Sequence, residues 1–442
     1  MAATMEEILE FLAGDQLPVQ RATSRHLSAV NPLFAESGLI DPRTQSKAIG
    51  LPWGYCGRER SGGLYFYDEY RLYQARLLHN PNVKVFGEID HRKSSGVKCM
   101  IYRGAACGYN HLVTDRKGEY TALADAIPGS KILRFGEGTN LFINPLDKAM
   151  PIDTQRDLVA SMVLTAMSGD RVTLNIQENS LLWEAIKDAH SHYGEGSRKV
   201  ATLPTLVEKL FQPTQTMADN MHRPVEYLRE LGYDLALGLR RLTDTDLRGM
   251  FHQETTTNLF QDTPLLVMNC EGITGDAAVI MITLINFFTQ SQWGRENPTY
   301  RFHKVIHDES WDLAAYPGFV ESVRRAFKLG RTWGVANWIV AHHKSNLDRS
   351  GNNEAIKDLI ADSDTTISYK QHETELEASA ADLEFNETEV ARILELEPGF
   401  AIHKVANNAG IEVEQIAWPE ELALLETSHL LHGQTELKKA AA

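Results

Sequence analysis

One segment of the sequence places a glycine, a lysine and two serines at a spacing that suits phosphate binding. Gly87 follows the apolar run 83–86, five residues separate it from Lys93, and Ser94 and Ser95 begin a helical stretch. In a loop of the GxxxxGK[ST] type, backbone N–H groups and the helix start surround the phosphates, the lysine reaches the β and γ phosphates, and the hydroxyl binds Mg²⁺. The spacing predicts a site for nucleotide phosphates and Mg²⁺, with a chance match to a short pattern as the alternative.

The last glycine of this frame is replaced by Arg92, and Asp90 and His91 precede it. A residue other than glycine at positive φ costs about 1–3 kcal/mol, or about one or two decades of affinity. The guanidinium of Arg92 could itself contact a phosphate and return about 1.5–3 kcal/mol. Asp90 opposes anion binding unless a cation neutralises it. We therefore expect weakened nucleotide binding and a larger loss in hydrolysis.

Two adjacent carboxylates, Asp308 and Glu309, end a second apolar run. At the C-terminal end of a parallel strand, such an aspartate holds Mg²⁺ through water, and the glutamate orients the attacking water. The alternative is a solvated strand end or a cap on the next helix. The alternation of strands and helices between this run and the phosphate loop favours the catalytic interpretation.

Short apolar runs alternate with helical segments along most of the chain. Strands are predicted at VKVFG, HLVTD, KILRF, PLLVMN, RFHKVIHDE, NWIVAHH, TTISY, FAIHKV and VEQIAW, with helices at 94–106 and 119–126. This alternation predicts an α/β fold with a mostly parallel central sheet. We divide the chain into an N-terminal adaptor segment (1–78), a first core part (79–150), a helical insertion (151–255), a second core part (256–418) and a tail (419–442).

Composition excludes several classes of protein. The formal net charge of −15 argues against a protein that coats nucleic acid, although a small basic loop remains compatible with it. The four cysteines form no CxxC pair, which argues against a zinc site or a disulfide framework and for a reducing, cytoplasmic setting. The most apolar run, 277–289, is shorter than the roughly 20 residues of a membrane span. The N-terminus lacks the basic region of a signal peptide.

Seven segments between residues 79 and 408 resemble, in order, the C-terminal ATPase domain of type IV secretion and conjugation traffic ATPases, which belong with the FtsK/HerA pumping ATPases. The pieces that carry the resemblance include the turn DRKGEY at 115–120, Asn144–Pro145, and the box Asp308–Trp311. The resemblance implies a RecA-like P-loop fold that binds ATP and Mg²⁺. It implies that Gly87, Arg92, Lys93, Ser94 and Ser95 lie at the phosphates, that Ser94 and Asp308 hold the metal, and that Lys93 and Glu309 act in hydrolysis.

Two further roles are implied by the resemblance alone. The family has a polar sensor after the strand written here as NWIVAHH, which gives this role to His343, with an ordinary strand end as the alternative. Arg331 stands where the family has an arginine, and a permanently charged guanidinium suits an arginine finger. A cation at a helix C-terminus is the alternative for Arg331.

The same resemblance implies a motor subunit that assembles into a ring, as a homo-oligomer and in the family pattern a hexamer, beside membrane-embedded secretion components. Two other functions stay open. Arg92 favours a catalytically silent scaffold subunit, whereas Arg240, Arg241 and Arg248 would serve a DNA translocase if they faced a channel. The solvated face of a helix is the alternative for these three arginines.

Overall fold

The structure is a computed structural model, and the residues that it describes fall within the range 54–425. It describes residues 54–60, 63–135, 141–148, 150–167, 173–192, 200–256, 263–271, 273, 275–293, 302–308, 319–320, 323–324, 326–328, 330, 334–342 and 360–425.

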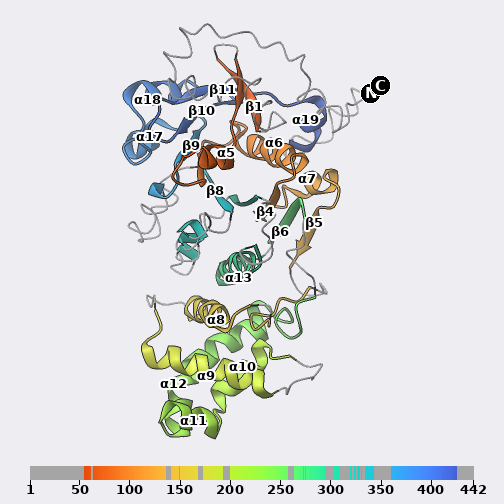
Figure 1. Cartoon of the computed structure of the whole chain (residues 1–442), viewed down its shortest axis with the longest axis vertical. Helices are drawn as coiled ribbons and strands as arrows, with labels where there is room; N and C mark the ends of the chain where they lie inside the picture. The colour runs from red at the N-terminus through yellow and green to blue at the C-terminus, as the bar shows by residue number, and fades with distance from the viewer. Residues whose placement is uncertain are drawn as a thin grey trace.

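One sheet of eleven strands runs through the described residues (Figure 1). Seven of its strands are parallel and lie side by side in the order β9, β3, β8, β7, β4, β6, β5. Their bounds are β3 Val83–Phe86, β4 Asn110–Asp115, β5 Lys131–Arg134, β6 Leu265–Asn269, β7 His303–Asp308, β8 Val335–Ala341 and β9 Thr365–Ser368. The predicted α/β class with a mostly parallel sheet is confirmed.

The remaining four strands extend the sheet in an antiparallel arrangement. They are β1 (Tyr55–Glu59), β2 (Leu64–Phe66), β10 (Phe400–Val405) and β11 (Ile411–Gln415). β10 pairs with β9, β11 with β10, β1 with β11 and β2 with β1. Residues from the start of the described chain therefore lie beside residues from its end, as Figure 1 shows at the top of the molecule.

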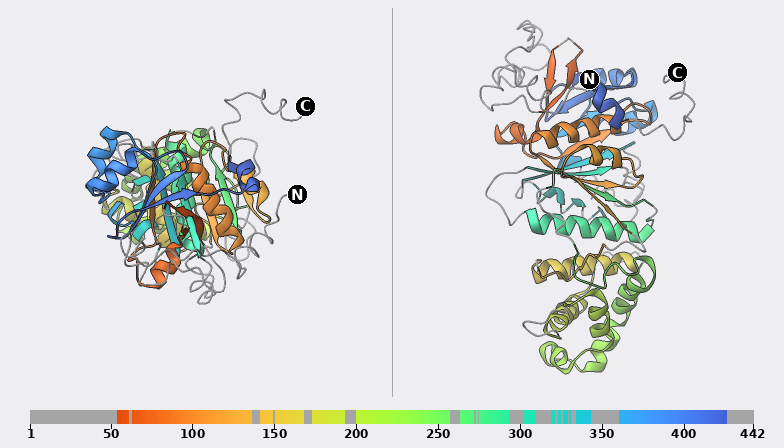
Figure 2. Two further views of the ribbon diagram at one scale, coloured as in Figure 1. Left: turned by 90° about the horizontal axis from the view of Figure 1, so that it is seen from above. Right: turned by 90° about the vertical axis from the view of Figure 1, so that its right-hand side faces the viewer.

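Helices cover both faces of the parallel strands (Figure 2). α5 (Glu69–Gln74), α6 (Lys93–Ala106), α7 (Thr121–Ala126) and α19 (Pro419–Leu425) lie on one side. α13 (Gly275–Trp293), α17 (Glu373–Ser379) and α18 (Glu387–Leu394) lie on the other. The strands between these layers are buried on both faces, which explains why their sequences are continuous apolar runs instead of alternating patterns.

The residues between β5 and β6 form a separate helical layer below α13 (Figure 2). Its elements are α8 (Ile152–Ala166), α9 (Ile176–His192), α10 (Leu203–Phe211), α11 (Gln215–Met221), α12 (Val225–Arg241) and the π-helical turn η1 (Leu242–Asp246). α8 packs against α13, and an ion pair of 2.9 Å joins Arg241 to Asp276 at the start of α13. The described residues of 151–255 contain no strand. Of the helices in the described residues, none is long and apolar enough to cross a membrane.

His403 and His111 are among the histidines that are buried in the sheet and shielded from water. His403 of β10 is fully buried with the rings of Tyr65 and Tyr67 edge-on to it, and burial lowers its pKa to about 3. Nδ1 of His111 in β4 donates a hydrogen bond to the Pro264 carbonyl, and burial, assisted by Lys304, lowers the pKa of His111 to about 3. Both imidazoles are therefore neutral in the folded protein at physiological pH.

The two shifts predict that stability decreases in mild acid. The unfolded chain takes up a proton at each histidine once the pH falls below about 6.5, whereas the folded chain does not until about pH 3. Each neutral histidine makes its full contribution to the free energy of unfolding above about pH 6.5. Below about pH 6.5 this contribution decreases by about 1.4 kcal/mol per pH unit for each histidine. His403→Phe keeps the ring contacts and removes one titrating group. Urea unfolding from pH 7 to 4.5 should give a shallower pH slope for this variant, and equal slopes would contradict the assignment.

Candidate nucleotide-binding site

The predicted phosphate loop lies between β3 and α6, at the C-terminal edge of the parallel strands. The N–H of Gly87 donates to the His342 carbonyl at 3.3 Å, and the N–H of Glu88 donates to the Lys370 carbonyl at 2.9 Å. A Cβ atom at Gly87 would lie 2.5 Å from Cβ of Tyr369, so no larger residue fits there. The loop is therefore held against the ends of both neighbouring strands, β8 and β9.

Two residues of the loop adopt left-handed backbone conformations. Asp90 has φ 67° and Arg92 has φ 64°, and Arg92 occupies the N-cap position of α6. Positive φ at Arg92 is what the missing glycine of the sequence frame predicts. Such a conformation costs about 1–3 kcal/mol for a residue with a side chain, and aspartate tolerates it better than arginine does. The loop thus keeps the shape of a phosphate loop at an energetic cost.

The first turn of α6 is suited to an anion. The side chain of Arg92, the N-cap residue, makes no capping hydrogen bond, and the first turn carries no acidic residue. Lys93 is only 3% exposed, while Ser94 and Ser95 are half-buried in the same turn. Helix N-termini with uncapped N–H groups attract phosphate, both through hydrogen bonds and through the helix dipole.

Strand β7, which ends at Asp308, lies near this loop because β8 alone separates β7 from β3. Phe86 of β3 is level with Ala341 of β8, and Val340 of β8 is level with Asp308 of β7. Asp308 is 5% exposed and ends its strand at the same edge of the sheet as Gly87. The structure therefore brings Gly87, Arg92, Lys93, Ser94, Ser95 and Asp308 to one edge. Glu309, Arg331 and His343 lie outside the described residues.

A buried tyrosine contacts Asp308 directly. The hydroxyl of Tyr120 donates to Oδ2 of Asp308 at 2.6 Å, and Tyr120 is 1% exposed. Burial raises the pKa of the Tyr120 hydroxyl well above its ordinary value, and the adjacent Asp308 carboxylate adds to the shift. The hydroxyl therefore stays protonated and acts as a donor.

A second lysine of α6 lies beside this pair. Lys98 is fully buried, its ammonium lies 5.2 Å from the centre of the Tyr120 ring, and it is 3.9 Å from Oε2 of Glu119. Burial lowers the pKa of Lys98, while the carboxylates of Glu119, Asp308 and Asp115 act in the opposite direction. From the sequence, Tyr120 was identified only as part of the turn DRKGEY, and Lys98 was not singled out. The usable signal was that Lys98 lies four residues after Ser94 on one helix, and so on the same helix face.

The residues at this edge fit Mg²⁺ as well as phosphate. A serine hydroxyl and a carboxylate are the oxygen donors that Mg²⁺ uses when substrate phosphates and water complete its shell. Among the described residues, no cluster of three or more histidine, cysteine or acidic side chains could hold a metal by protein ligands alone. Ser94 and Asp308 would therefore hold Mg²⁺ together with phosphate oxygens and water.

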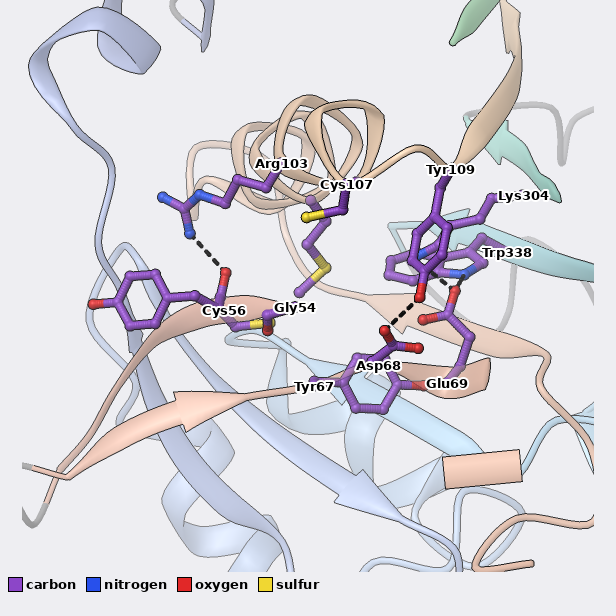
Figure 3. Close-up of a pocket in the computed structure, with 13 residues that line it drawn as sticks. Gly54, Cys56, Tyr67, Asp68, Glu69, Arg103, Cys107, Tyr109, Lys304 and Trp338 are labelled. Atoms are coloured by element: carbon purple, nitrogen blue, oxygen red, sulfur yellow. Dashed lines mark hydrogen bonds and ion pairs between the residues drawn. The ribbon is translucent and has the colours of Figure 1, made fainter. Parts of the chain in front are cut away.

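A different polar cluster braces β7 and β8 from the side of α5 (Figure 3). Oε1 of Glu69 accepts from Lys304 of β7 at 2.8 Å and from the indole N–H of Trp338 of β8 at 3.0 Å. Burial raises the pKa of Glu69, and Lys304 opposes that shift. The adjoining cavity has a volume of about 20 Å³, enough for about one water molecule. This cluster therefore orients the two strands and has no room for a nucleotide.

Comparison with known proteins finds similarity in structure only. No family model and no curated protein matches the sequence. The solved structure of VirB4 from Thermoanaerobacter pseudethanolicus matches with a TM-score of 0.65 and 16% identity, over 84% of this chain and 98% of that chain. The plasmid coupling protein TrwB in complex with ADP and Mg²⁺ matches with a TM-score of 0.56 and 13% identity, over 76% of this chain and 85% of that one. The RecA-like P-loop fold expected from the sequence resemblance is confirmed.

The geometry of the loop predicts that Arg92→Gly strengthens nucleotide binding. Glycine relieves the strain at φ 64°, whereas Arg92→Ala keeps the strain and removes the guanidinium. We expect titration with a fluorescent ATP analogue to show tighter binding for the glycine variant, by about tenfold if the strain is about 1–2 kcal/mol and the guanidinium contributes little. The alanine variant should bind no better than wild type.

Ala406→Gly provides the matched control, because Ala406 has φ 48° beyond the end of β10 and outside the site. This control should stabilise the fold without changing nucleotide affinity. Equal affinities of wild type and Arg92→Gly would show that the loop is not impaired.

Proposed function

We propose that this chain is an ATPase motor subunit of a type IV secretion or conjugative transfer apparatus, in which ATP hydrolysis is coupled to substrate transport or to assembly of the apparatus. The observation that carries the proposal is the arrangement of Lys93, Ser94 and Asp308 at one sheet edge, beside an uncapped helix N-terminus. The likeness in fold to VirB4, and to TrwB bound to ADP and Mg²⁺, supports it.

In this proposal each residue at the edge has a separate role. Lys93 and the N–H groups of the first turn of α6 bind the β and γ phosphates, and Ser94 and Asp308 hold Mg²⁺. When bound, Mg²⁺ neutralises charge that develops on the phosphate oxygens. Glu309 orients the attacking water, His343 contacts the γ phosphate, and Arg92 and Ser95 flank the phosphates. Compact, preorganised donors of this kind stabilise the transition state more than the bound substrate.

We further propose a homo-oligomeric ring, six-membered by family resemblance, in which Arg331 reaches the nucleotide of the adjacent subunit. Head-to-tail contacts close into rings when the rotation permits. The ring would work in the cytoplasm, at the inner face of the membrane, through membrane-embedded secretion components.

The alternative of a DNA translocase that binds nucleic acid directly receives little support. Arg240 pairs with Asp244 at 3.0 Å, and Arg241 pairs with Asp276 at 2.9 Å, so carboxylates already offset both charges. The net charge of −15 acts in the same direction. We therefore favour a motor that acts through partner proteins.

One observation favours a second candidate, a catalytically weak or silent scaffold subunit. Arg92 and Asp90 both adopt positive φ in the phosphate loop, and neither is glycine. The strain disfavours the tight phosphate geometry that hydrolysis requires, and it disfavours ground-state binding less. Steady-state phosphate release with Mg²⁺ and ATP separates the two candidates, because a scaffold subunit would neither bind nor turn over ATP efficiently.

Lys93→Ala should abolish most of whatever turnover the protein has. Loss of the lysine removes a buried cation from the phosphates, and removal of a single preorganised donor costs on the order of 100-fold in kcat. Glu309→Gln should reduce turnover as strongly and retain nucleotide binding, because it affects the attacking water and not the phosphates. Phosphate release and nucleotide titration, made on the same preparations, measure both quantities.

Lys187→Ala is the control for the first variant, since Lys187 is 46% exposed on α9 in the helical layer. Its turnover should equal that of wild type. If Lys93→Ala hydrolysed ATP as fast as this control, the site would be assigned to the wrong loop.

Mixed assemblies test whether Arg331 acts on a neighbour. Arg331→Ala and Lys93→Ala should each be inactive alone, yet mixing them creates interfaces that join an intact loop to an intact arginine. Random mixing in equal amounts makes such interfaces about one quarter of the total. Phosphate release from the mixture should recover toward that fraction. A mixture as inactive as its components, in rings shown to exchange subunits, would place Arg331 in its own subunit's site or outside catalysis.

A further inference from the structure

The turn after β4 is folded by a single carboxylate. Oδ1 of Asp115 accepts from the N–H groups of Lys117, Gly118 and Glu119 at 3.2, 2.8 and 3.1 Å, and Oδ2 accepts from the N–H of Tyr120 at 3.0 Å. Gly118 has φ 76°, which glycine adopts without strain. Asp115 is itself 2% exposed, so these contacts are shielded from water and hold the turn in one conformation.

This turn positions the Tyr120 side chain beside the end of β7. Because its backbone N–H is bound to Asp115 and its side chain is buried, the Tyr120 ring has one position available. From there its hydroxyl reaches Oδ2 of Asp308 at 2.6 Å. A carboxylate bound at one oxygen by a fixed donor cannot rotate freely about its Cβ–Cγ bond, so the direction of its second oxygen is fixed as well.

Lys98 completes the cluster from α6. Its buried ammonium lies over the Tyr120 ring and 3.9 Å from Glu119, so it contacts two successive residues of the turn. α6 begins at Lys93 and Ser94 in the phosphate loop. The helix that carries the loop is therefore linked to the turn that orients Asp308. Tyr120 makes this connection because its hydroxyl donates to the Asp308 side chain; a hydrogen bond to a backbone carbonyl would not orient that carboxylate.

We propose that Tyr120 is a positioning residue for Asp308, and that its hydroxyl orients this carboxylate for a divalent cation on the nucleotide, directly or through water. The inference rests on the proposed function and extends it to the segment DRKGEY. Asp115 and Gly118 form the turn, Glu119 pairs with Lys98, and Tyr120 orients Asp308. Hydrogen bonds to metal-binding carboxylates commonly contribute about 10- to 100-fold to metal affinity.

Tyr120→Phe tests the proposal because it removes the hydroxyl and keeps the ring. Binding of a fluorescent ATP analogue is titrated with MgCl₂, beginning in EDTA. We expect the half-saturating Mg²⁺ concentration to rise by about tenfold or more relative to wild type. Affinity measured in EDTA should change less than about twofold, since the phosphate loop itself is intact.

Tyr109→Phe is a closely matched control. The Tyr109 hydroxyl also donates to a buried aspartate, Oδ2 of Asp68 at 2.5 Å, and this pair lies beside the cavity near α5 (Figure 3). Tyr109 precedes Asn110, which pairs with the first residue of β7, whereas Asp308 is the last residue of β7. Loss of the Tyr109 hydroxyl should lower the thermal unfolding temperature about as much as Tyr120→Phe does, and it should leave the Mg²⁺ midpoint unchanged. A Mg²⁺ midpoint that moves equally in both variants would make the effect a general loss of stability and overturn the proposal.

A second measurement needs no nucleotide. The chain is labelled with 3-fluorotyrosine, and the ¹⁹F resonance of Tyr120 is identified by its absence in Tyr120→Phe. Asp308→Asn should shift this resonance and leave that of Tyr109 in place. An unshifted Tyr120 resonance would overturn the proposal.

If the wild-type chain bound no nucleotide with or without Mg²⁺, the proposed function would fail on its own. The ¹⁹F result would then still decide whether Tyr120 holds Asp308. If the chain bound nucleotide in a Mg²⁺-dependent way and Tyr120→Phe kept the wild-type midpoint, the role of Tyr120 would fail and the proposed function would stand.

Discussion

The candidate site depends on three parallel strands that end level with one another. β3, β8 and β7 lie side by side, with Phe86 opposite Ala341 and Val340 opposite Asp308. A slip of one residue in a parallel strand would turn its side chains to the opposite face, and it would move Asp308 away from the phosphate loop. The buried Glu69 bridges Lys304 of β7 and Trp338 of β8, and so fixes two of these strands against each other. The third strand, β3, is held from its other side by the parallel strand β9, since Gly87 packs against Tyr369, the residue that follows β9.

The phosphate loop contains strained backbone conformations and is held by hydrogen bonds to neighbouring segments. Arg92 and Asp90 hold left-handed conformations that glycine would adopt more readily, yet the loop is bonded at Glu88 to Lys370 and at His91 to Gly399. Strained residues persist when the surrounding structure determines their conformation. The shape of the loop is therefore kept without its last glycine. The consequence for function lies in the side chain of Arg92, because a guanidinium replaces the last glycine of the loop frame.

Much of this fold could be predicted from local sequence, and the exceptions have a common physical cause. Runs such as VKVF and LLVMN identify strands because both faces of a parallel sheet are buried, and positive φ at Arg92 follows from the loop frame. The place of β8 between β3 and β7 could not be predicted, because strand order is set by contacts between distant segments. The pairing of β1 with β11 is similar, as Gly57 lies opposite Gln415. The hydrogen bond between Tyr120 and Asp308 could not be predicted for the same reason, since the two residues lie 188 positions apart in sequence.

The central claim is that this edge of the sheet binds a nucleotide together with Mg²⁺, and calorimetric titration of the wild-type chain with ADP tests it most directly. The account predicts one site per chain with a dissociation constant in the micromolar-to-millimolar range, that is about −8 to −4 kcal/mol. It further predicts that EDTA weakens the binding and that Lys93→Ala removes it. Heat of binding that is absent at millimolar ADP, or that is the same in Lys93→Ala as in wild type, would contradict the account.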